Sequence, residues 1–220
     1  MPTPATKYSP EVSPCLHLPR VDPVSPAVLL DPFDDPEWVF EPKYDGIRGF
    51  VYASRGTAEL RSRQDLRLDR LDELCTRIAG VLGEREVILD GEIVSLDRQG
   101  KPNFRDLIRG EGFLAFAAFD LLWLNGSDLR GLPLDDRKRK LAGLLPEDTG
   151  PLYKILTLDE CGRALFNAIR KMDLAGIVAK RRDEPYGPGT TWLQIANPVY
   201  AQGDARMNLL RRRERSRATR

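Results

Sequence analysis

Alternation of apolar and polar residues predicts several short strands along the middle of the chain. Residues 38–41 and 47–52 are rich in aromatic and β-branched side chains and flank an Asp45-Gly46 pair. Such segments on either side of a turn dipeptide are typical of two strands joined by a tight turn. Three further strands are predicted at residues 58–62, 86–96 and 113–124.

Apolar residues at helical spacing predict the helices. Leu71, Leu74, Cys75, Ile78 and Leu82 recur every three or four residues, which indicates an amphipathic helix over residues 69–82. Strands outnumber helices and do not alternate with them regularly, so the pattern favours an α+β sandwich over a doubly wound parallel sheet. The remaining predicted elements are a short helix near Asp106, helices at 137–145 and 159–172, and strands at 176–180 and 192–196.

Proline and charge divide the chain into three parts. Ten of the 17 prolines lie in the first 42 residues, which forbids a helix there and favours an extended strap or a flexible leader over residues 1–36. We expect one domain over residues 37–203. The last part, 204–220, is a basic tail: from Arg206 it holds seven arginines and one glutamate. It suits either contact with phosphates or a solvated terminus.

Composition excludes several classes of protein. With 41% hydrophobic and 30% charged residues the chain is globular, and no apolar run reaches the roughly 20 residues of a membrane span. The first residues show no basic region followed by an apolar stretch, so we expect no secretory signal. Three distant cysteines suit neither a disulfide framework nor a zinc site. We therefore expect a cytoplasmic protein. His17 is the only histidine, which argues against a histidine base.

The most informative segment is residues 41–48. Lys43 and Asp45 are two apart at the end of a predicted strand, so they face the same side. A lysine on such a rigid element suits a nucleophile once it loses its proton, which nearby cations such as Arg48 or Lys180 would favour. Taken alone, these residues favour an exposed hairpin with Asp-Gly at its tip over a nucleophile.

Three other features carry the same ambiguity. Asp90 and Glu92 flank a glycine, an arrangement that suits a divalent metal or a ribose hydroxyl and also an ordinary β-bulge. Phe119, before Asp120 in an apolar strand, suits either base stacking or the core. Lys180 ends a buried strand, where it would meet a phosphate or simply cap the strand at the surface.

Taken in order, these blocks resemble a known family. Residues 43–48 (Lys-Tyr-Asp-Gly-Ile-Arg) match the K-x-D-G-x-R motif of covalent nucleotidyltransferases, which include ATP-dependent DNA ligases, RNA ligases and mRNA capping enzymes. The blocks that follow, together with residues 125–137, are similar to bacterial ATP-dependent DNA ligases, including the ligase domain of end-joining proteins, over about residues 38–200. The other blocks are Ser62-Arg63, residues 89–94, 118–122, 176–181 and 192–198.

The resemblance implies a two-sheet, ATP-grasp-like adenylation fold and a lysyl-AMP intermediate used to join DNA strands in repair. By motif, Lys43 would attack the α-phosphate of ATP, and the cofactors would be ATP with Mg²⁺ or Mn²⁺. The nucleotide-binding residues would be Glu41 at the adenine amino group, Arg48 and Arg63 at the ribose and phosphate side, Glu92 at the ribose or metal, Phe119 stacked on adenine, Lys180 at the α-phosphate, and Ile177 beside it.

The sequence departs from this pattern at three positions. Ala175 stands where the family usually has a metal-binding glutamate, and Gln194 and Ala196 stand where it has two lysines on the α-phosphate. The sequence also ends too soon after Pro198 for the OB-fold domain of active ligases, so we expect none unless a separate chain supplies it. Two hypotheses follow: an ATP-dependent ligase of weakened activity acting on nicked or broken DNA, or a degenerate module that binds nucleotide or DNA ends, with or without an end-joining partner. A capping-type GTP transferase is a distant third.

Overall fold

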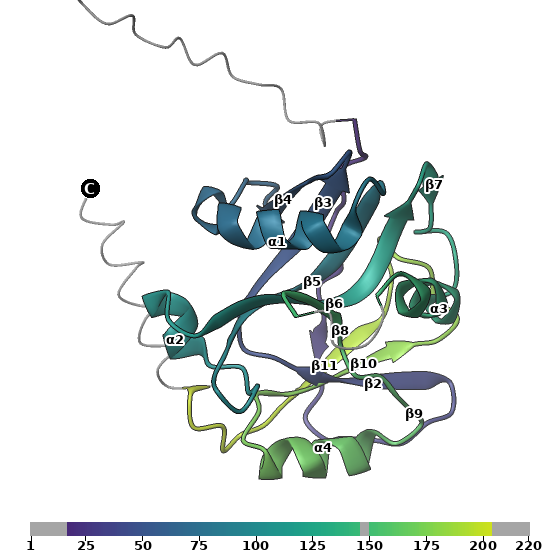
Figure 1. The fold of residues 1–220 in the computed structure, drawn as a ribbon. Coiled ribbons are helices and arrows are strands. Elements are labelled where there is room, and N and C mark those ends of the chain that lie inside the picture. Colours follow the sequence, from purple (N-terminus) through teal and green to yellow (C-terminus); the bar gives the residue numbers. More distant parts are fainter. Residues whose placement is uncertain (1–16, 146–149, 204–220) are drawn as a thin grey trace, which may run out of the picture.

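Two β-sheets lie face to face in the computed structural model, which describes residues 17–145 and 150–203 (Figure 1). The lower sheet in Figure 1 has the strand order β1-β11-β10-β2-β9, and β10 runs antiparallel to both of its neighbours. Its strands are β1 (Ala27–Val28), β11 (Trp192–Ala196), β10 (Gly176–Arg181), β2 (Trp38–Lys43) and β9 (Leu158–Asp159).

The upper sheet has the order β4-β3-β5-β6-β7, with β8 paired in parallel to β6. Antiparallel pairing joins β3 to β5 and β5 to β6, so these three strands form the centre of this sheet. Its strands are β4 (Thr57–Ser62), β3 (Ile47–Ser54), β5 (Val87–Leu96), β6 (Phe113–Leu124), β7 (Ser127–Asp128) and β8 (Leu152–Lys154).

Helices cover the outer faces of the two sheets. In Figure 1, α1 lies on the upper sheet and α4 under the lower one, while α3 lies beside both. A 3-10 turn, Asp69–Leu71, precedes α1. The helices are α1 (Asp72–Leu82), α2 (Phe104–Arg109), α3 (Leu134–Leu144) and α4 (Gly162–Lys171). None of the helices in the described ranges is long and apolar enough to cross a membrane.

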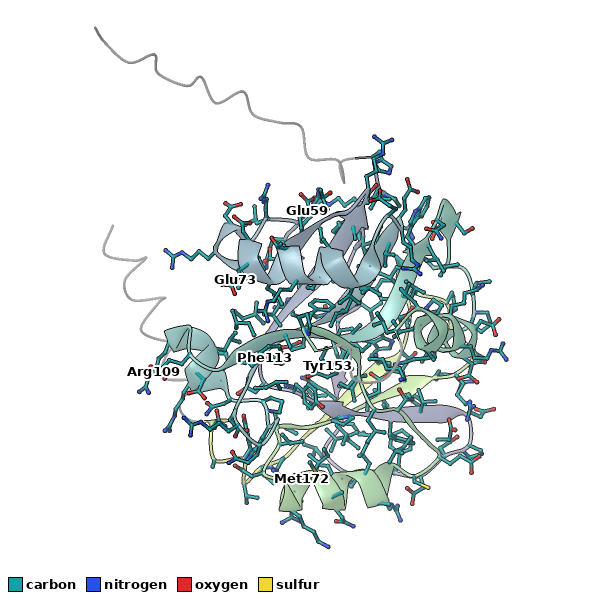
Figure 2. All side chains as sticks on the ribbon, in the orientation of Figure 1. Glu59, Glu73, Arg109, Phe113, Tyr153 and Met172 are labelled. Atoms are coloured by element: carbon teal, nitrogen blue, oxygen red, sulfur yellow. The ribbon has the colours of Figure 1, made fainter. Side chains whose placement is uncertain are left out.

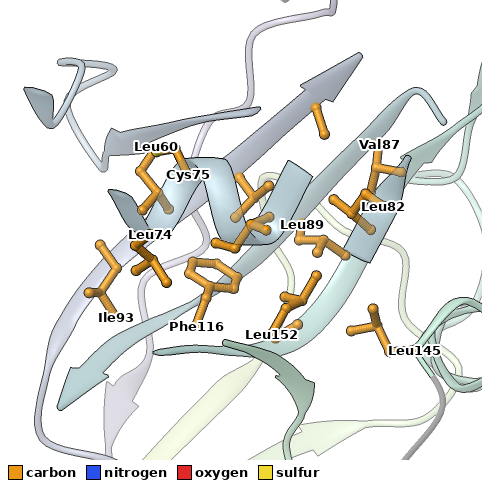
Figure 3. Close-up of a cluster of buried hydrophobic side chains, with 14 of the residues drawn as sticks. Leu60, Leu74, Cys75, Leu82, Val87, Leu89, Ile93, Phe116, Leu145 and Leu152 are labelled. Carbon is orange, nitrogen blue, oxygen red and sulfur yellow. The ribbon is translucent and has the colours of Figure 1, made fainter. Parts of the chain in front are cut away.

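Two hydrophobic cores lie between the sheets and their helices. The larger one packs α1 against β3, β5 and β6 through residues such as Leu74, Leu89 and Phe116, all fully buried (Figure 3). The smaller one packs α4 against Phe40, Ile177 and neighbours on the lower sheet. Each sheet therefore turns one face to a helix and keeps the other for the space between the sheets, where the candidate site lies.

Several predicted elements differ in the structure. The segments predicted as a hairpin around Asp45-Gly46 are β2 and β3, which belong to different sheets, so the chain crosses from one layer to the other there. The helix predicted to begin at residue 159 begins at Gly162, because Asp159 pairs with Val39 and Glu160 has a positive φ of 63°. The strand predicted over residues 86–96 begins at Val87 and runs unbroken through the polar triplet Asp90-Gly91-Glu92.

The proline-rich segment is packed where it is described. Leu18, Val21 and Val24 are buried in a cluster with Phe50 and Trp192 between the sheets. Residues 27–28 then add a parallel strand beside β11. Of the two alternatives for residues 1–36, the part from residue 17 onward is an extended strap; residues 1–16 and the basic tail at 204–220 lie outside the described residues.

A buried polar network lies between the sheets and connects several elements. Asp90 on β5 is fully buried and accepts hydrogen bonds from Arg48 Nη2 at 2.7 Å and from the Tyr186 hydroxyl at 2.7 Å. Asp120 on β6 and Arg137 on α3 form a second, bidentate pair, both fully buried. Buried charges need such partners, so this network fixes β3, β5, β6 and α3 relative to one another.

We expect Tyr186→Phe to lower the free energy of unfolding by about 2 kcal/mol, because it removes one buried hydrogen bond to a charged acceptor. Equilibrium urea unfolding measures the change. Tyr153→Phe, at a half-buried tyrosine of β8 away from this network, serves as the control and should change stability by less than about 0.5 kcal/mol. Equal losses in the two variants would show that the Tyr186–Asp90 hydrogen bond does not stabilise the fold.

Candidate nucleotide-binding site

Three rows of side chains on the lower sheet face the upper sheet. Residues directly opposite each other in antiparallel strands share a face, so the register defines the rows. The row at one end holds Lys43, Gly176 and Ala196, and the row at the other end holds Val39, Lys180 and Trp192. The middle row consists of Glu41, Val178 and Gln194.

The upper sheet adds side chains from three strands. Arg48 on β3 lies opposite Glu92 on β5, so both face the lower sheet. On β6, Ala118 pairs with Gly91 and Asp120 with Asp90, which leaves Phe119 as the extra residue of a β-bulge. A bulge re-aims a side chain, and here it turns the Phe119 ring toward the space between the sheets. A β-bulge was one alternative for residues 90–92 of β5, but the extra residue, Phe119, is on the neighbouring strand β6.

Close packing at the crossover explains Gly46. A Cβ atom there would lie 2.2 Å from the carbonyl oxygen of Ile93 and 2.8 Å from Cγ of Glu92, so only glycine fits. Asp45 beside it is 3% exposed. These residues are therefore the buried link between the sheets, which rules out an exposed hairpin tip. The link places Lys43 and Glu92 next to the same space.

The cavity between the sheets has a volume of about 400 Å³, within the usual range for small-molecule sites. Half-buried Lys43 lines it, and exposed Arg63 lies at its rim after β4. Of the eight site residues predicted from the sequence, seven line this cavity: Glu41, Lys43, Arg48, Arg63, Glu92, Phe119 and Lys180.

Ile177 does not reach the cavity. It is fully buried on the opposite face of β10, in the core under α4, because side chains alternate along a strand. Its neighbour Val178 lines the cavity in its place. The prediction for Ile177 was therefore wrong by one position.

Lys180 lies at a different end of the cavity from the one expected. Lys180 pairs with Val39, whereas Lys43 pairs with Gly176. Positions 176 and 180 are four residues apart on β10, which separates the two lysines by roughly 13 Å along the strand. Its Nζ lies 2.7 Å from Glu41 Oε2 and within 4.4 Å of the centroid of the Phe119 ring. It therefore lies beside Glu41 and Phe119 rather than beside the Lys43 amine.

Burial and two neighbouring lysines set the charge state of this end of the cavity. Burial and the charge of Lys138 lower the pKa of Lys180 to about 8, although Glu41 opposes the change. Burial alone would raise the pKa of Glu41, but the charges of Lys138 and Lys180 outweigh it and hold the pKa below its ordinary value. Glu41 is therefore an anion at neutral pH and can only accept hydrogen bonds.

Arg48 is held in place by the network described above. It donates to both oxygens of Asp90 and to the carbonyl of Val24 on the strap. Burial alone would lower the pKa of Arg48, but Asp90 outweighs it and raises the pKa, so the guanidinium is always charged. Its plane also lies over the Phe119 ring, with Cζ 5.4 Å from the centroid. The cavity thus contains a fixed cation beside the Phe119 and Trp192 rings.

Three cavity neighbours were missed by sequence reasoning: Lys138, Trp192 and Pro26. Lys138 on α3 forms an ion pair with Glu41 Oε1, and Trp192 packs edge-on against Phe119 at 5.7 Å between ring centroids. Pro26 of the strap lines the cavity wall. Lys138 and Pro26 gave no signal of their own, because their places depend on tertiary packing. Trp192 could have been found, since it begins the same block as Gln194.

Within the described residues there is no group of three or more histidine, cysteine, aspartate or glutamate side chains arranged to hold a metal ion. Glu41 and Glu92 are the two carboxylates that line the cavity, and Glu41 is already paired with two lysines. Ala175 precedes β10 without a carboxylate. Magnesium prefers phosphate oxygens and one or two carboxylates. This site therefore suits an ion that enters with the phosphates of a substrate and takes at most one ligand from Glu92.

A two-sheet α+β fold with a motif lysine facing a cavity between the sheets is that of the nucleotidyltransferase class. Residues 22–195 match the family model for the ATP-dependent DNA ligase domain, and the chain belongs to this family. The resemblance seen in the sequence motifs and the predicted fold class are thus both confirmed.

Individual relatives agree with this assignment. The chain is 37% identical over 155 residues to the multifunctional non-homologous end joining DNA repair protein LigD of Mycobacterium tuberculosis, covering 70% of this chain and 20% of that protein. It is 36% identical over 183 residues to a probable DNA ligase of Streptomyces coelicolor, covering 73% and 35%. The chain spans about a fifth of the length of the LigD protein.

A solved structure agrees as well. Mycobacterial DNA ligase D in complex with ATP and MES superposes with a TM-score of 0.67 at 32% identity, covering 78% of this chain and 60% of that one. The ATP-dependent ligase of bacteriophage T7 with ATP, at 14% identity and a TM-score of 0.54, shares the fold.

Proposed function

We propose that this chain transfers AMP from ATP to Lys43, as the first step of DNA strand joining. The observation that carries the proposal is the convergence of seven motif residues from both sheets on one cavity, with Lys43 in its wall. The relatives named above are end-joining and probable DNA ligases, which supports nicked or broken DNA as the acceptor of AMP. The reaction would take place in the cytoplasm, where ATP is supplied.

The step requires a neutral amine at Lys43. From an ordinary pKa near 10.4, a neutral amine at pH 7 requires a shift of roughly 3 units. Half-burial of Lys43 in the cavity wall favours this change. The amine then attacks the α-phosphorus, a P–N bond forms, the P–O bond to the β-phosphate breaks, and pyrophosphate leaves with that electron pair. The second amine proton passes to solvent.

The remaining residues bind and orient the nucleotide. Glu41 accepts a hydrogen bond from the adenine amino group, and the Phe119 ring stacks on the base. Glu92 binds the ribose hydroxyls or the Mg²⁺ or Mn²⁺ that enters with ATP. Arg48 and Arg63 neutralise negative charge on the ribose and phosphate side. Lys180 acts at the base end by fixing Glu41, a role that its position on β10 supports better than contact with the α-phosphate. Such positioning supplies most of the rate in phosphoryl transfer.

A second function is favoured by a specific observation. Gln194 is in the cavity wall and Ala196 is in the row of Lys43, yet neither has the charge that the family pattern places there. Loss of one preorganised donor costs about 10²–10³ in rate. The alternative is a module that binds nucleotide or DNA ends without adenylation, with or without an OB-fold or end-joining protein as its partner.

Mass spectrometry of the intact chain and of its peptides, after incubation with ATP and Mg²⁺ or Mn²⁺, separates these two functions. Formation of lysyl-AMP predicts the added mass of AMP on the peptide that contains Lys43, and its loss when pyrophosphate is added. An unmodified Lys43 peptide at high protein and ATP concentration, in a chain that still binds ATP, would support the binding module and reject the adenylyltransferase.

A further inference from the structure

Glu41 is held by two lysines from different elements, and the sequence motifs account for only one of them. Lys180 of β10 approaches Oε2, and Lys138 of α3 pairs with Oε1. The carboxylate is 2% exposed and Lys180 1% exposed. Two cations therefore share one buried anion, each on its own oxygen.

Lys138 approaches Glu41 from outside the nucleotide cavity. It lines a second, larger cavity of about 1,010 Å³, whose walls include Tyr153 of β8 and Phe113 of β6. Figure 2 labels Phe113 and Tyr153, which lie below α1 and above α4 in that view. Tyr44 and Ile155 line both cavities, so the Glu41–Lys138 pair lies in the wall that separates them.

The position of Lys138 is fixed before any nucleotide binds. Its neighbour Arg137 is fully buried and bidentate to Asp120, which anchors that turn of α3 on β6. The Lys138 Nζ also donates to the Thr157 hydroxyl at 3.3 Å. Helix anchoring and a second acceptor therefore limit the rotamers of Lys138, as expected for a preorganised contact.

A carboxylate between two ammonium groups keeps acceptor capacity on both oxygens. An ionised carboxylate has about four lone-pair sites. Here the Lys138 ammonium donates to Oε1 and the Lys180 ammonium lies 2.7 Å from Oε2, so each lysine approaches a separate oxygen. The remaining sites accept an amino group and repel a carbonyl oxygen. With Lys180 as its sole partner, the carboxylate would rotate to offer both oxygens to that ammonium and lose its aim at the base.

We propose that Lys138 is a positioning residue for base selection: it holds Glu41 in the orientation that prefers a purine with an exocyclic amine, as in ATP, over one with a carbonyl, as in GTP. The inference rests on the proposed role of Glu41 at the base. It does not require that Lys43 become adenylated, since selection takes place on binding.

Equilibrium binding of MgATP and MgGTP, measured by isothermal titration calorimetry in a Lys43→Ala background that cannot form an adenylate, tests the inference. We expect Lys138→Met to reduce the preference for ATP over GTP by about tenfold or more, because an aimed, charge-assisted hydrogen bond is lost. Lys138→Arg, which keeps the charge, should restore most of the preference. Lys140→Met, at an exposed lysine of the same helix, should bind both nucleotides as the background does.

The outcomes are distinct. An unchanged ATP/GTP ratio in Lys138→Met, or equal weakening of both nucleotides, overturns the proposal, because a purely structural lysine would act on both alike. A parent chain that prefers ATP yet shows no adenylate by mass spectrometry defeats the lysyl-AMP proposal alone. A parent chain that binds neither nucleotide overturns both proposals.

Discussion

Replacement of Lys43 by alanine should abolish covalent labelling by ATP carrying a label on its α-phosphate. Lys43 is half-buried at the end of β2 and lines the cavity, so its removal eliminates the nucleophile without opening a core. The loss should be complete within detection, because no P–N bond forms at this position without the amine. Denaturing gel electrophoresis of wild type and variant, after equal times with ATP and Mg²⁺, provides the measurement.

A second variant separates the nucleophile from its charge. Lys43→Arg keeps a cation in the cavity, but a guanidinium does not deprotonate in proteins and cannot attack. We expect it to bind ATP and to remain unlabelled. Lys171→Ala, at an exposed lysine at the end of α4, should label as wild type does. Label retained on Lys43→Ala would move the reaction to another side chain and refute the assignment of Lys43.

Sequence reasoning predicts the face on which a side chain lies where that face follows from alternation along its own strand. Alternation along β2 and β10 places Glu41, Lys43 and Lys180 on one face, and the structure has them there. The order of the motifs predicted that Glu92 and Phe119 lie at the same site, and both line the cavity. Ile177 failed by the same rule, since it alternates with Val178 and therefore faces α4.

Features that depend on pairing between distant segments could not be predicted. Apolar patterns around Asp45-Gly46 predict two strands but do not show which sheet each strand joins. The sequence therefore predicts a hairpin where the chain crosses from one sheet to the other. The bulge that turns Phe119 depends on a register shift against β5, which no local pattern shows. Lys138 lies on an ordinary polar face of a helix, and only the packing of α3 on β6 brings it to Glu41.

The geometry also explains what the departures from the family pattern cost. Gln194 shares a row with Glu41, while Ala196 shares a row with Lys43 and is separated from it only by Gly176. Gly176 has no side chain to fill this row, and a Cβ atom there would lie 2.2 Å from the Ile195 carbonyl oxygen. A lysine at position 196 would therefore extend over Gly176 toward the Lys43 amine, where the proposed reaction would place the α-phosphate.

Restoration of both cations should raise the rate of lysyl-AMP formation by about 10²-fold or more. We expect this of the double variant Gln194→Lys/Ala196→Lys, because each added ammonium stabilises the charge that develops on the α-phosphate, and a single such donor accounts for about 10²–10³ in rate. The ammonium at position 196 also favours the neutral form of the Lys43 amine. Rapid-quench measurement of adenylate formation at saturating ATP gives the rate. The two gains will not simply multiply, since both act on one phosphate.

Added positive charge anywhere on the chain would also strengthen the binding of ATP. The double variant therefore needs a control that adds a lysine outside the cavity. Val199→Lys adds a cation at a position that is 64% exposed and follows β11, outside the cavity. It should leave the rate at saturating ATP unchanged, because it cannot reach the phosphate that Lys43 attacks. If the double variant were no faster than Val199→Lys, the absent lysines would not limit catalysis. The binding module would then be the better account of why Gln194 and Ala196 occupy these rows.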